Sequence, residues 1–519
     1  MRQDILIGID AGTSVIKAVA FDLSGRQVAI ASRRNAYVNE PGGGVVQDMG
    51  RTWRDTANVL RELTERVDGL AQRVLALAVT GQGDGTWLVD ANGEPVHDAW
   101  LWLDARAVAE AREIASSDGI GVIYEKTGTG VNVCQMRTHL RWMKCNAPDL
   151  LAKAATAFHC KDWIYFNLTG IRAADPSEGV FTFGDFRTRG YCENVVGALD
   201  LSDLRHLLPP IVDGAVEAHP LSASAARATG LPEGLPVSLA YVDVMCSALG
   251  GGLYDPQQRP GLTVLGSTGV HIRFVPDPKD VHLNAERSGY TMTLPGTQLA
   301  QMQTNMAATL NIDWMLGLAS QVLASHGLAR SHSDLLDKLD DRVLAARPGA
   351  ALYHPYISEA GERGPFAEPY ARASFTGLNQ QTDWFGMVRA VYEGLAFASR
   401  DCYAVMGEMP GEIRLSGGAA QSSALRKILS AALNTPTRTV DQPEAGAAGA
   451  VMIAAVAAGV FPDIEAVSKS WILPLLNTPE PPDAELARHY RELFDVYVAT
   501  RHALAPVWER QACTGRTVN

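Results

Sequence analysis

The chain has 519 residues, 47% hydrophobic and 20% charged, a composition that excludes disordered, collagen-like and coiled-coil proteins and allows two or three domains with buried cores. Its 45 Lys and Arg against 57 Asp and Glu give a net charge of −12, which excludes the broad basic surface needed to bind nucleic acid or an anionic membrane. Seven scattered cysteines without a CxxC pair fit neither a disulfide framework nor a zinc knuckle, so we expect a reducing, cytoplasmic setting.

The first quarter of the chain alternates strand-forming runs with turns. We expect strands over 5–10, 16–25 and 27–32, followed by a helix over 52–67 in which Trp53, Ala57, Leu60 and Leu63 recur at helical spacing. The run VLALAVT at 74–80 predicts a buried strand that ends in the glycine-rich loop GQGDG.

The same order of elements returns in the second half of the chain. Residues 261–274 (GLTVLGSTGVHIRF) predict a strand, a hydroxyl-rich turn and a second strand, and residues 412–433 predict a strand, a glycine turn and an amphipathic helix. We therefore predict an α/β protein of two domains, 1–250 and 251–519, with the boundary among the small residues 247–253.

Two further helices are predicted near the C-terminus. The uncharged run 445–461 falls short of the roughly 20 residues that span a bilayer, so a buried helix is expected there in preference to a membrane span. From Pro481 onward the chain predicts a helix with Tyr490, Leu493, Phe494 and Tyr497 on one face, as in core packing.

The turn after the first strand has the residues of an anion site. Gly12 allows a close approach of backbone N–H groups, Thr13 and Ser14 add hydroxyl donors, and Lys17 supplies a positive charge. Asp10 could hold a hydrated Mg²⁺, which prefers hard oxygen ligands. The alternative is a β-hairpin with an ordinary surface turn.

A second turn, Gly266-Ser267-Thr268-Gly269, carries the same donors, and two such turns could grip a polyphosphate from opposite sides. A third turn, Ser416 to Ala419, contains Gly417 and Gly418 before a helix at Ser423, leaving room for a flat base against the chain. The GxxxxGK[ST] and GxGxxG loops and the protein-kinase HRD and DFG elements are absent from the sequence.

Taken in order, these segments resemble the FGGY family of carbohydrate kinases, within the actin-like ATPase superfamily, over nearly the whole chain. The resemblance is carried by IGIDAGTSVIKAVAFD, WLDARA at 102–107, KDWIYFNLTG followed by DPS at 175–177, AYVDVMCSALGGG, LGSTG at 265–269, RGPFAEPYARASFTGL, SGGAAQSSALRKILSAAL and PEAGAAGAVMIAAVAAG. It implies two actin-like (ribonuclease H-like) domains with ATP and substrate in the cleft between them.

The resemblance also implies the chemistry. ATP, with Mg²⁺, would give its γ-phosphoryl group to a hydroxyl of a sugar or polyol, and Asp243 would be the base that takes the hydroxyl proton. The adenosine would lie against Gly417, Gly418 and Ala419, with Ser422 where glycerol kinases often have Asn. As an alternative, Asp243 could cap the helix expected over 244–249, and both roles could coexist.

The expected acceptor follows from the loop after the strand at 74–80. Gln82, Gly83 and Asp84 stand where family members contact the acceptor, and positions 83 and 84 match neither the Arg-Glu pair of glycerol kinases nor the Met-His pair of xylulose kinases. Val244 replaces a polar residue frequent in both groups. The loop and the segment around Asp243 resemble the branch that phosphorylates erythritol, so a small acyclic polyol is expected, with L-xylulose, another ketopentose or glycerol as alternatives.

Other predictions are less specific. Trp87 and Trp102 could be walls of the acceptor site or ordinary core residues. Arg106 could reach the substrate or a phosphate, or form a salt bridge with Asp104 or Asp98. A homodimer is expected by analogy with the family. The rival class is a non-catalytic, actin-like nucleotide-binding protein.

Overall fold

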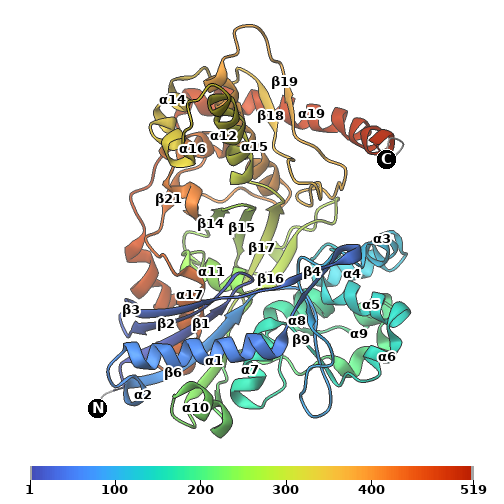
Figure 1. The fold of residues 1–519 in the computed structure, drawn as a ribbon, viewed down its shortest axis with the longest axis vertical. Helices are drawn as coiled ribbons and strands as arrows, with labels where there is room; N and C mark the ends of the chain where they lie inside the picture. The colour runs from blue at the N-terminus through green and yellow to red at the C-terminus, as the bar shows by residue number, and fades with distance from the viewer. Residues whose placement is uncertain (1–2, 516–519) are drawn as a thin grey trace.

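The computed structural model describes residues 3–515, in which two α/β halves each contain a six-stranded sheet (Figure 1). The first sheet has the order β12-β13-β6-β1-β2-β3, and β1 pairs antiparallel with β2 and parallel with β6. Its strands are β1 (Ile5–Ala11), β2 (Val15–Asp22), β3 (Gln27–Arg34), β6 (Val74–Gly81), β12 (His219–Pro220) and β13 (Pro236–Leu239). The strands predicted in this part of the chain are confirmed.

The second sheet repeats this pairing. Its order is β16-β17-β15-β14-β20-β21, and β14 pairs antiparallel with β15 and parallel with β20, as β1 does with β2 and β6. The strands are β14 (Gly261–Leu265), β15 (Gly269–Val275), β16 (Tyr290–Thr293), β17 (Leu299–Asn305), β20 (Ile413–Ser416) and β21 (Thr437–Thr439). The predicted repetition of the same order of elements in both halves is therefore confirmed.

Helices cover the outer face of each sheet. One face of the first sheet packs against α1 (Met49–Arg66), α7 (Cys160–Thr169) and α10 (Ala223–Thr229), with short α2 (Leu70–Arg73) leading into β6. Asp48 caps α1 by accepting a hydrogen bond from the N–H of Arg51, so this helix begins three residues before the predicted Thr52.

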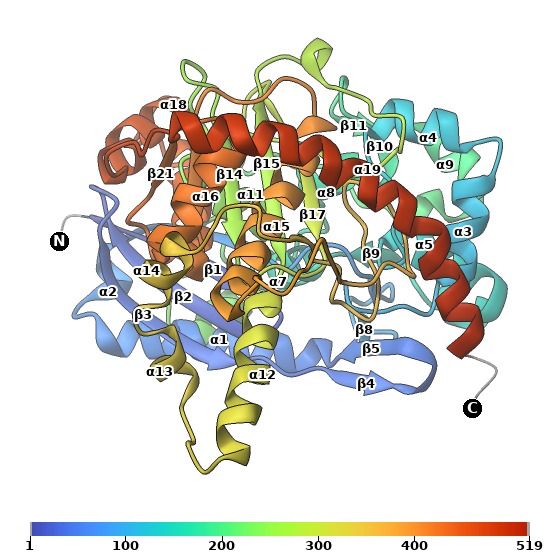
Figure 2. The same ribbon diagram turned by 90° about the horizontal axis from the view of Figure 1, so that it is seen from above.

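The outer layer of the second half is larger. It contains α12 (Thr309–Ser325), α14 (Leu339–Ala345), α15 (Trp384–Ala404), α16 (Ser423–Leu433) and α19 (Ala484–Gly515), with α13 (His332–Leu336) and the strands β18 (Leu352–His354) and β19 (Ser374–Thr376) beside them. Figure 2 shows α19 running across this layer. Tyr490 and Tyr497 are fully buried and Leu493 and Phe494 partly buried, which confirms the predicted core-facing side of this helix.

Two helices lie between the sheets, α11 (Asp243–Gly250) and α17 (Ala445–Ala457), and they share one core with the inner faces of both sheets (Figure 1). Their backbones approach so closely that a Cβ added to Gly449 would lie 1.9 Å from the carbonyl oxygen of Cys246. A Cβ at Gly250 would lie 2.1 Å from the carbonyl oxygen of Ala445. The buried helix predicted within 445–461 is confirmed, and in the described range no helix is both long and apolar enough to span a bilayer.

A largely helical region is inserted into the first half and has its own core. It comprises β4 (Val38–Glu40), β5 (Gly44–Gln47), β7 (Trp87–Val89), β8 (Ala99–Trp100), α3 (Val108–Ser116), α4 (Ile120–Thr127), α5 (Met136–Asn146), α6 (Pro148–Leu151), β9 (Thr156–Phe158), α8 (Pro176–Phe183), β10 (Gly184–Asp185), β11 (Gly190–Tyr191) and α9 (Glu193–Ala198). The remaining helix, α18 (Ile464–Val467), follows α17. The boundary after residue 250 stays a prediction.

The contact between α11 and α17 predicts an unusual response to Gly449→Ala. Alanine in a helix interior normally gains about 0.5–1 kcal/mol over glycine, but here the new methyl group would collide with the α11 backbone, which cannot move aside like a side chain. We expect the free energy of unfolding to fall by about 2 kcal/mol or more in a denaturant titration. Gly317→Ala in α12 is the control, because nothing lies within 4 Å of its added Cβ, and it should be neutral or stabilising. Equal effects of the two substitutions would contradict the close packing.

Candidate active site

A cavity of about 220 Å³ lies between the two halves of the chain. Residues from the first half form one side, and strands β15, β16 and β17 together with Arg363 form the other. Its lining residues are Thr13, Gly83, Asp84, Trp102, Phe181, Val242, Asp243, Val244, Val270, Tyr290, Met292, Met302, Thr304 and Arg363. Five residues predicted for the site, from four separate segments, therefore meet here: Thr13, Gly83, Asp84, Trp102 and Asp243.

The alternation of side chains along β1 determines which face of the first sheet carries Asp10. Alternate side chains of a strand point to opposite faces, so Leu6, Gly8 and Asp10 share the face of β1 that packs against α17. A Cβ added to Gly446, in the first turn of α17, would lie 2.4 Å from Oδ2 of Asp10. Burial raises the pKa of Asp10 to about 6, while the charge of Lys17 opposes this shift.

Lys17 is paired in this structure. Its Nζ lies 2.7 Å from Oε2 of Glu444, the residue directly before α17. Neither carboxylate oxygen of Asp10 accepts a hydrogen bond from a residue within 3–515, so both remain open to a hydrated cation. No three His, Cys, Asp or Glu side chains of the described chain form a group that could hold a metal ion by themselves.

The first turn links the predicted phosphate residues to the acceptor loop. Thr13 Oγ1 donates to Oε1 of Gln82 at 2.9 Å and accepts from Nε1 of Trp102 at 2.8 Å. The hydroxyl of Ser14 is exposed and makes no hydrogen bond to another described residue. Of the two hydroxyls predicted to bind phosphate, that of Thr13 is thus used in hydrogen bonds within the cavity wall, whereas that of Ser14 is available to a ligand.

Asp243 is the first residue of α11, and its Oδ1 accepts a hydrogen bond of 2.6 Å from the N–H of Val244. The residue at the cap position is Val242, so Asp243 supports the start of the helix from one position inside it. Burial, followed by the negative charges of Asp10 and Glu178, raises the pKa of Asp243 to about 8. A carboxyl group with a pKa this close to neutrality has the basicity that a general base requires.

Asp84 has the left-handed backbone conformation, with φ of 53°, and its Oδ2 accepts from the hydroxyl of Tyr290 at 3.2 Å. Its other oxygen, Oδ1, is buried and has no hydrogen-bond partner among the described residues. Burial raises the pKa of Asp84, and the charges of His159 and Arg363 act in the opposite direction. An unpartnered buried acceptor on the wall of a cavity is suited to bind a hydroxyl group of a ligand.

Gly83 packs against the residue that precedes the predicted base. A Cβ at position 83 would lie 2.5 Å from Cγ2 of Val242, so the Val242 side chain occupies the space that a larger residue would need. Gly83 and Val242 are therefore matched to each other in this chain.

Three other residues predicted for the acceptor site have different surroundings. Gln82 is buried behind the cavity, where its Nε2 donates to Gln47. Arg106 forms ion pairs with Asp104 and Glu40, and its guanidinium carbon lies 3.6 Å from the ring centre of Trp100, so the salt-bridge interpretation describes it. The side chain of Trp87 is buried in the core, whereas Trp102 lines the cavity.

The second turn lies between β14 and β15 and is held by the start of α12. The N–H groups of Ala308 and Thr309 donate to the carbonyl oxygens of Ser267 and Gly266. The side-chain hydroxyls of Ser267 and Thr268 make no hydrogen bond to the rest of the described chain. These two hydroxyls are free to bind a ligand.

A cavity of about 1020 Å³ lies in the second half, among the ends of β20 and β21 and the segment 477–480. Gly417 and Gly418 line it, and a Cβ at Gly417 would lie 2.8 Å from the carbonyl oxygen of Leu265, so the glycine is required there. Ala419 lies in the short 3₁₀ turn 418–421. Ser422 is outside the lining: it caps α16 and donates to Asp340 at 2.6 Å.

Sequence reasoning missed the side of the smaller cavity that comes from the second half. Tyr290 and Met292 alternate on β16, and Met302 and Thr304 alternate on β17, so each pair shares one face of its strand. This alternation could have been recognised in the sequence, but it does not show which other segment of the chain the shared face contacts. Arg363 opens the segment RGPFAEPYARASFTGL, and its charge acts on Asp84 across the cavity.

Known protein families and individual relatives are similar to this chain over most of its length. Models of the N-terminal and C-terminal domains of the FGGY family of carbohydrate kinases match residues 5–250 and 261–458. An erythritol kinase of Brucella abortus (strain 2308) is 54% identical over 512 residues, covering 98% of each chain. A xylulose kinase of Staphylococcus epidermidis (strain ATCC 12228 / FDA PCI 1200) is 25% identical over 507 residues, covering 96% of this chain and 97% of the relative.

Solved structures show the same fold. A gluconate kinase from Lactobacillus acidophilus superposes with a TM-score of 0.88 at 21% identity, covering 98% of this chain and 99% of the other. A xylulose kinase from Rhodospirillum rubrum superposes with a TM-score of 0.86 at 25% identity, covering 97% of this chain and 100% of the other. The two-domain α/β architecture expected from the sequence is thereby confirmed.

The environment of Asp243 predicts that Asp243→Asn stabilises the protein. In the folded chain this carboxyl keeps its proton up to about pH 8, whereas in the unfolded chain it releases the proton near pH 3.8, so its contribution to stability falls as the pH rises between these values. Relative to the wild type, the gain of the variant in free energy of unfolding should grow with pH, from about 1.5 kcal/mol at pH 5 to about 5 kcal/mol at pH 8. Denaturant titrations at both pH values measure this.

Asp22→Asn is the control with the opposite sign. Hydrogen bonds from Ser24 and Arg26 outweigh desolvation and lower the pKa of Asp22, so its substitution should cost stability at neutral pH and matter less in acid. A loss of stability at pH 8 in Asp243→Asn, similar to that in Asp22→Asn, would contradict the raised pKa.

Proposed function

Because this chain belongs to the FGGY family of carbohydrate kinases and is thus an ATP-dependent carbohydrate or polyol kinase, we propose that its acceptor is a small acyclic polyol, erythritol, and its products erythritol phosphate and ADP. The observation that carries the proposal is the meeting of Asp84 and Asp243 in one cavity of about 220 Å³. This is smaller than the roughly 300–1,000 Å³ of drug-sized ligand sites. The 54% identity to an erythritol kinase supports the choice of acceptor.

The polar groups of the cavity suit a chain of hydroxyls. Asp84 Oδ1 accepts a hydrogen bond from one hydroxyl, which removes the cost of leaving that oxygen buried and unpaired. Arg363 donates to a hydroxyl oxygen, since only its Nε is used within the described chain, toward Thr304 at 2.8 Å. Phe181, Met292 and Met302 are apolar walls for the carbon chain.

Asp243 is the base in this proposal. The acceptor hydroxyl loses its proton as its oxygen bonds to the γ-phosphorus of ATP, and the bond from that phosphorus to the ADP oxygen breaks. The proton passes to a carboxylate oxygen of Asp243 in its deprotonated form, which the raised pKa makes a stronger proton acceptor than an ordinary carboxylate. The N–H of Val244 fixes Oδ1, which leaves Oδ2 for the substrate.

The nucleotide spans the two halves. We assign the adenosine to the cavity of about 1020 Å³ lined by Gly417 and Gly418, and the phosphates to the turns Gly12–Ser14 and Gly266–Thr268. Lys17 would exchange its partner Glu444 for a phosphate oxygen. Asp10 would hold a hydrated Mg²⁺, which neutralises charge on the phosphates. A homodimer and a cytoplasmic location remain predictions.

An ADP-release assay over erythritol, other tetritols, pentitols, glycerol and the ketopentoses tests the acceptor. We expect the highest kcat/KM with erythritol, and turnover of xylulose or ribulose alone would contradict a polyol acceptor.

Asp243→Asn should lower kcat by about 100- to 10,000-fold with ATP binding retained, as expected for loss of a general base. Asp203→Asn, at an exposed carboxylate paired with Lys144, is the control and should keep the wild-type rate. An unchanged rate in Asp243→Asn would exclude it as the base.

The match between Gly83 and Val242 makes a second prediction. Gly83→Ala forces its new methyl group against Val242, a stiff β-branched residue next to Asp243, so the base should shift and kcat/KM for the polyol fall by tenfold or more. Adding Val242→Ala removes the colliding methyl group and should restore much of the loss. Gly121→Ala, which has nothing within 4 Å of its added Cβ, is the control. Additive losses in the double variant would show that the two residues are not matched.

A further inference from the structure

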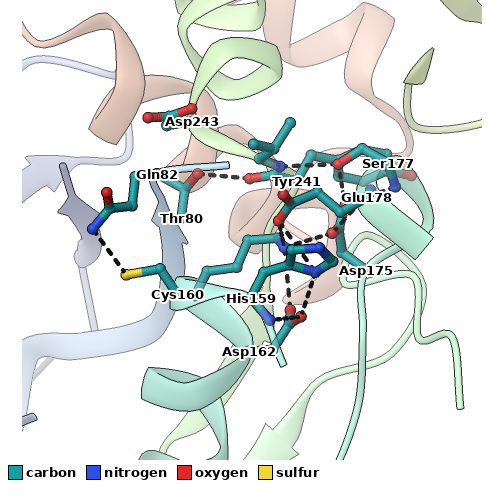
Figure 3. Close-up of polar contacts among 12 residues, drawn as sticks. Thr80, Gln82, His159, Cys160, Asp162, Asp175, Ser177, Glu178, Tyr241 and Asp243 are labelled. Carbon is teal, nitrogen blue, oxygen red and sulfur yellow. Dashed lines mark hydrogen bonds and ion pairs between the residues drawn. The ribbon is translucent and has the colours of Figure 1, made fainter. Parts of the chain in front are cut away.

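A buried cluster of charges around Lys161 contacts the backbone of Asp84, which lines the acceptor cavity of about 220 Å³, and Figure 3 labels four other members of the cluster, His159, Asp162, Asp175 and Glu178. Lys161 Nζ, from α7, lies 2.7 Å from Oδ1 of Asp175 and 3.2 Å from Oδ1 of Asp162, and it forms a third ion pair with Glu178. His159 lies 3.3 Å from Asp162 and 3.7 Å from Glu178. Each of these side chains is at most 4% exposed.

Stability alone is a poor explanation for this cluster. Removing charges from water has a large free-energy cost, and apolar residues of similar volume often replace buried ion pairs without loss of stability. Three carboxyl groups surround Lys161, and burial raises the pKa of one of them, Glu178. The contacts that the cluster makes with other segments are therefore the more informative feature.

Two consecutive residues of α8 connect the cluster to the acceptor cavity. Ser177 Oγ accepts a hydrogen bond of 3.0 Å from the N–H of Val242, directly before Asp243, and itself donates to Asp175. Glu178 Oε1 accepts a hydrogen bond of 2.7 Å from the N–H of Asp84. The start of one helix thus holds the backbone of Asp84 and the backbone of Val242, the residue before the predicted base.

The bond to Asp84 supports an unfavourable conformation. A non-glycine residue with positive φ costs conformational free energy and persists only when its surroundings fix it. Glu178 supplies that support with a charge-assisted bond to the amide of Asp84, while its other oxygen is held by Lys161. Position 83 must remain small here as well, because a Cβ on Gly83 would lie 3.3 Å from Oε1 of Glu178.

We propose that Ser177 and Glu178, oriented by Lys161, are positioning residues that fix Asp84 relative to Asp243 and thereby select which end of the polyol meets the base. This proposal rests on the proposed function. Erythritol is a meso compound whose two terminal hydroxyls differ only by handedness, so phosphorylation at one end or the other gives mirror-image products. The two ends are distinguished only when three non-equivalent contacts act together: the carboxylate that binds, the carboxylate that removes the proton, and a third group on the opposite wall, Arg363.

The test measures kcat, KM and the ratio of the two mirror-image erythritol phosphates. Glu178→Gln loses the charge that Lys161 orients, so KM for erythritol should rise about tenfold, KM for ATP should change less than about twofold, and the product ratio should move toward equality. Ser177→Ala leaves the charges in place and frees the N–H of Val242, so kcat should fall about tenfold with KM for erythritol nearly unchanged. Ser177→Thr keeps a hydroxyl and should restore most of the rate.

Glu393→Gln is the matched control. Glu393 forms a buried ion pair of 2.8 Å with Arg389 in α15, at most 3% exposed, and it lines neither cavity. This variant should lower the melting temperature without changing KM or the product ratio. If Ser177→Ala and Glu178→Gln also lower only the melting temperature while the wild type phosphorylates erythritol, the positioning proposal is overturned alone. If the wild type phosphorylates no polyol, the proposed function fails and this proposal fails with it.

Discussion

The close packing of two helix backbones between the sheets is the constraint on which the rest of this structure depends. Glycines 250 and 449 allow α11 and α17 to touch main chain to main chain, so both helices fit in one layer shared by the two halves. Asp243 begins α11, and Asp10 lies on the strand face that α17 covers. The distance between these carboxylates, and with it the rise that the charge of Asp10 adds to the pKa of Asp243, follows from how closely the helices pack.

The two halves contribute different chemistry to the acceptor cavity. The first half supplies the carboxylates and the buried network that holds their backbones, whereas the second half supplies mainly apolar walls and one arginine. Carboxyl groups are thus concentrated on one side, and the charge of Arg363 on the other side acts to lower the pKa of one of them, Asp84. A pocket divided in this way binds a polar, uncharged chain more readily than an anionic one.

Local patterns predicted most of the architecture. The alternation in ILIGID, the turn residues at 12–14 and 266–268, and the uncharged run at 445–461 report on neighbours in the chain, and the structure has the corresponding strands, turns and buried helix. The resemblance to a known family, and not spacing, indicated Asp243 and the loop 82–84.

What could not be predicted depends on contacts between distant segments. Nothing near Arg106 in sequence shows that Glu40 and the ring of Trp100 would enclose it, and Ser422 meets Asp340 only after α14 and α16 pack together. The side of the cavity formed by Tyr290, Met292 and Arg363 has the same origin. Strand period assigns such residues to a face, but the partner of that face is decided by tertiary packing.

The hydrogen bond from Tyr290 to Asp84 has a mechanical consequence. It is one of the hydrogen bonds that join β16 and its neighbouring residues to the first half. Another is the bond of 2.8 Å that the N–H of Gly130 donates to the carbonyl oxygen of Gly289. Any rotation of one half that preserved these bonds would have its axis near β16. Because β20 and β21 form the opposite edge of the same sheet, rotation about that axis would move them farther than the residues beside Tyr290 and Asp84.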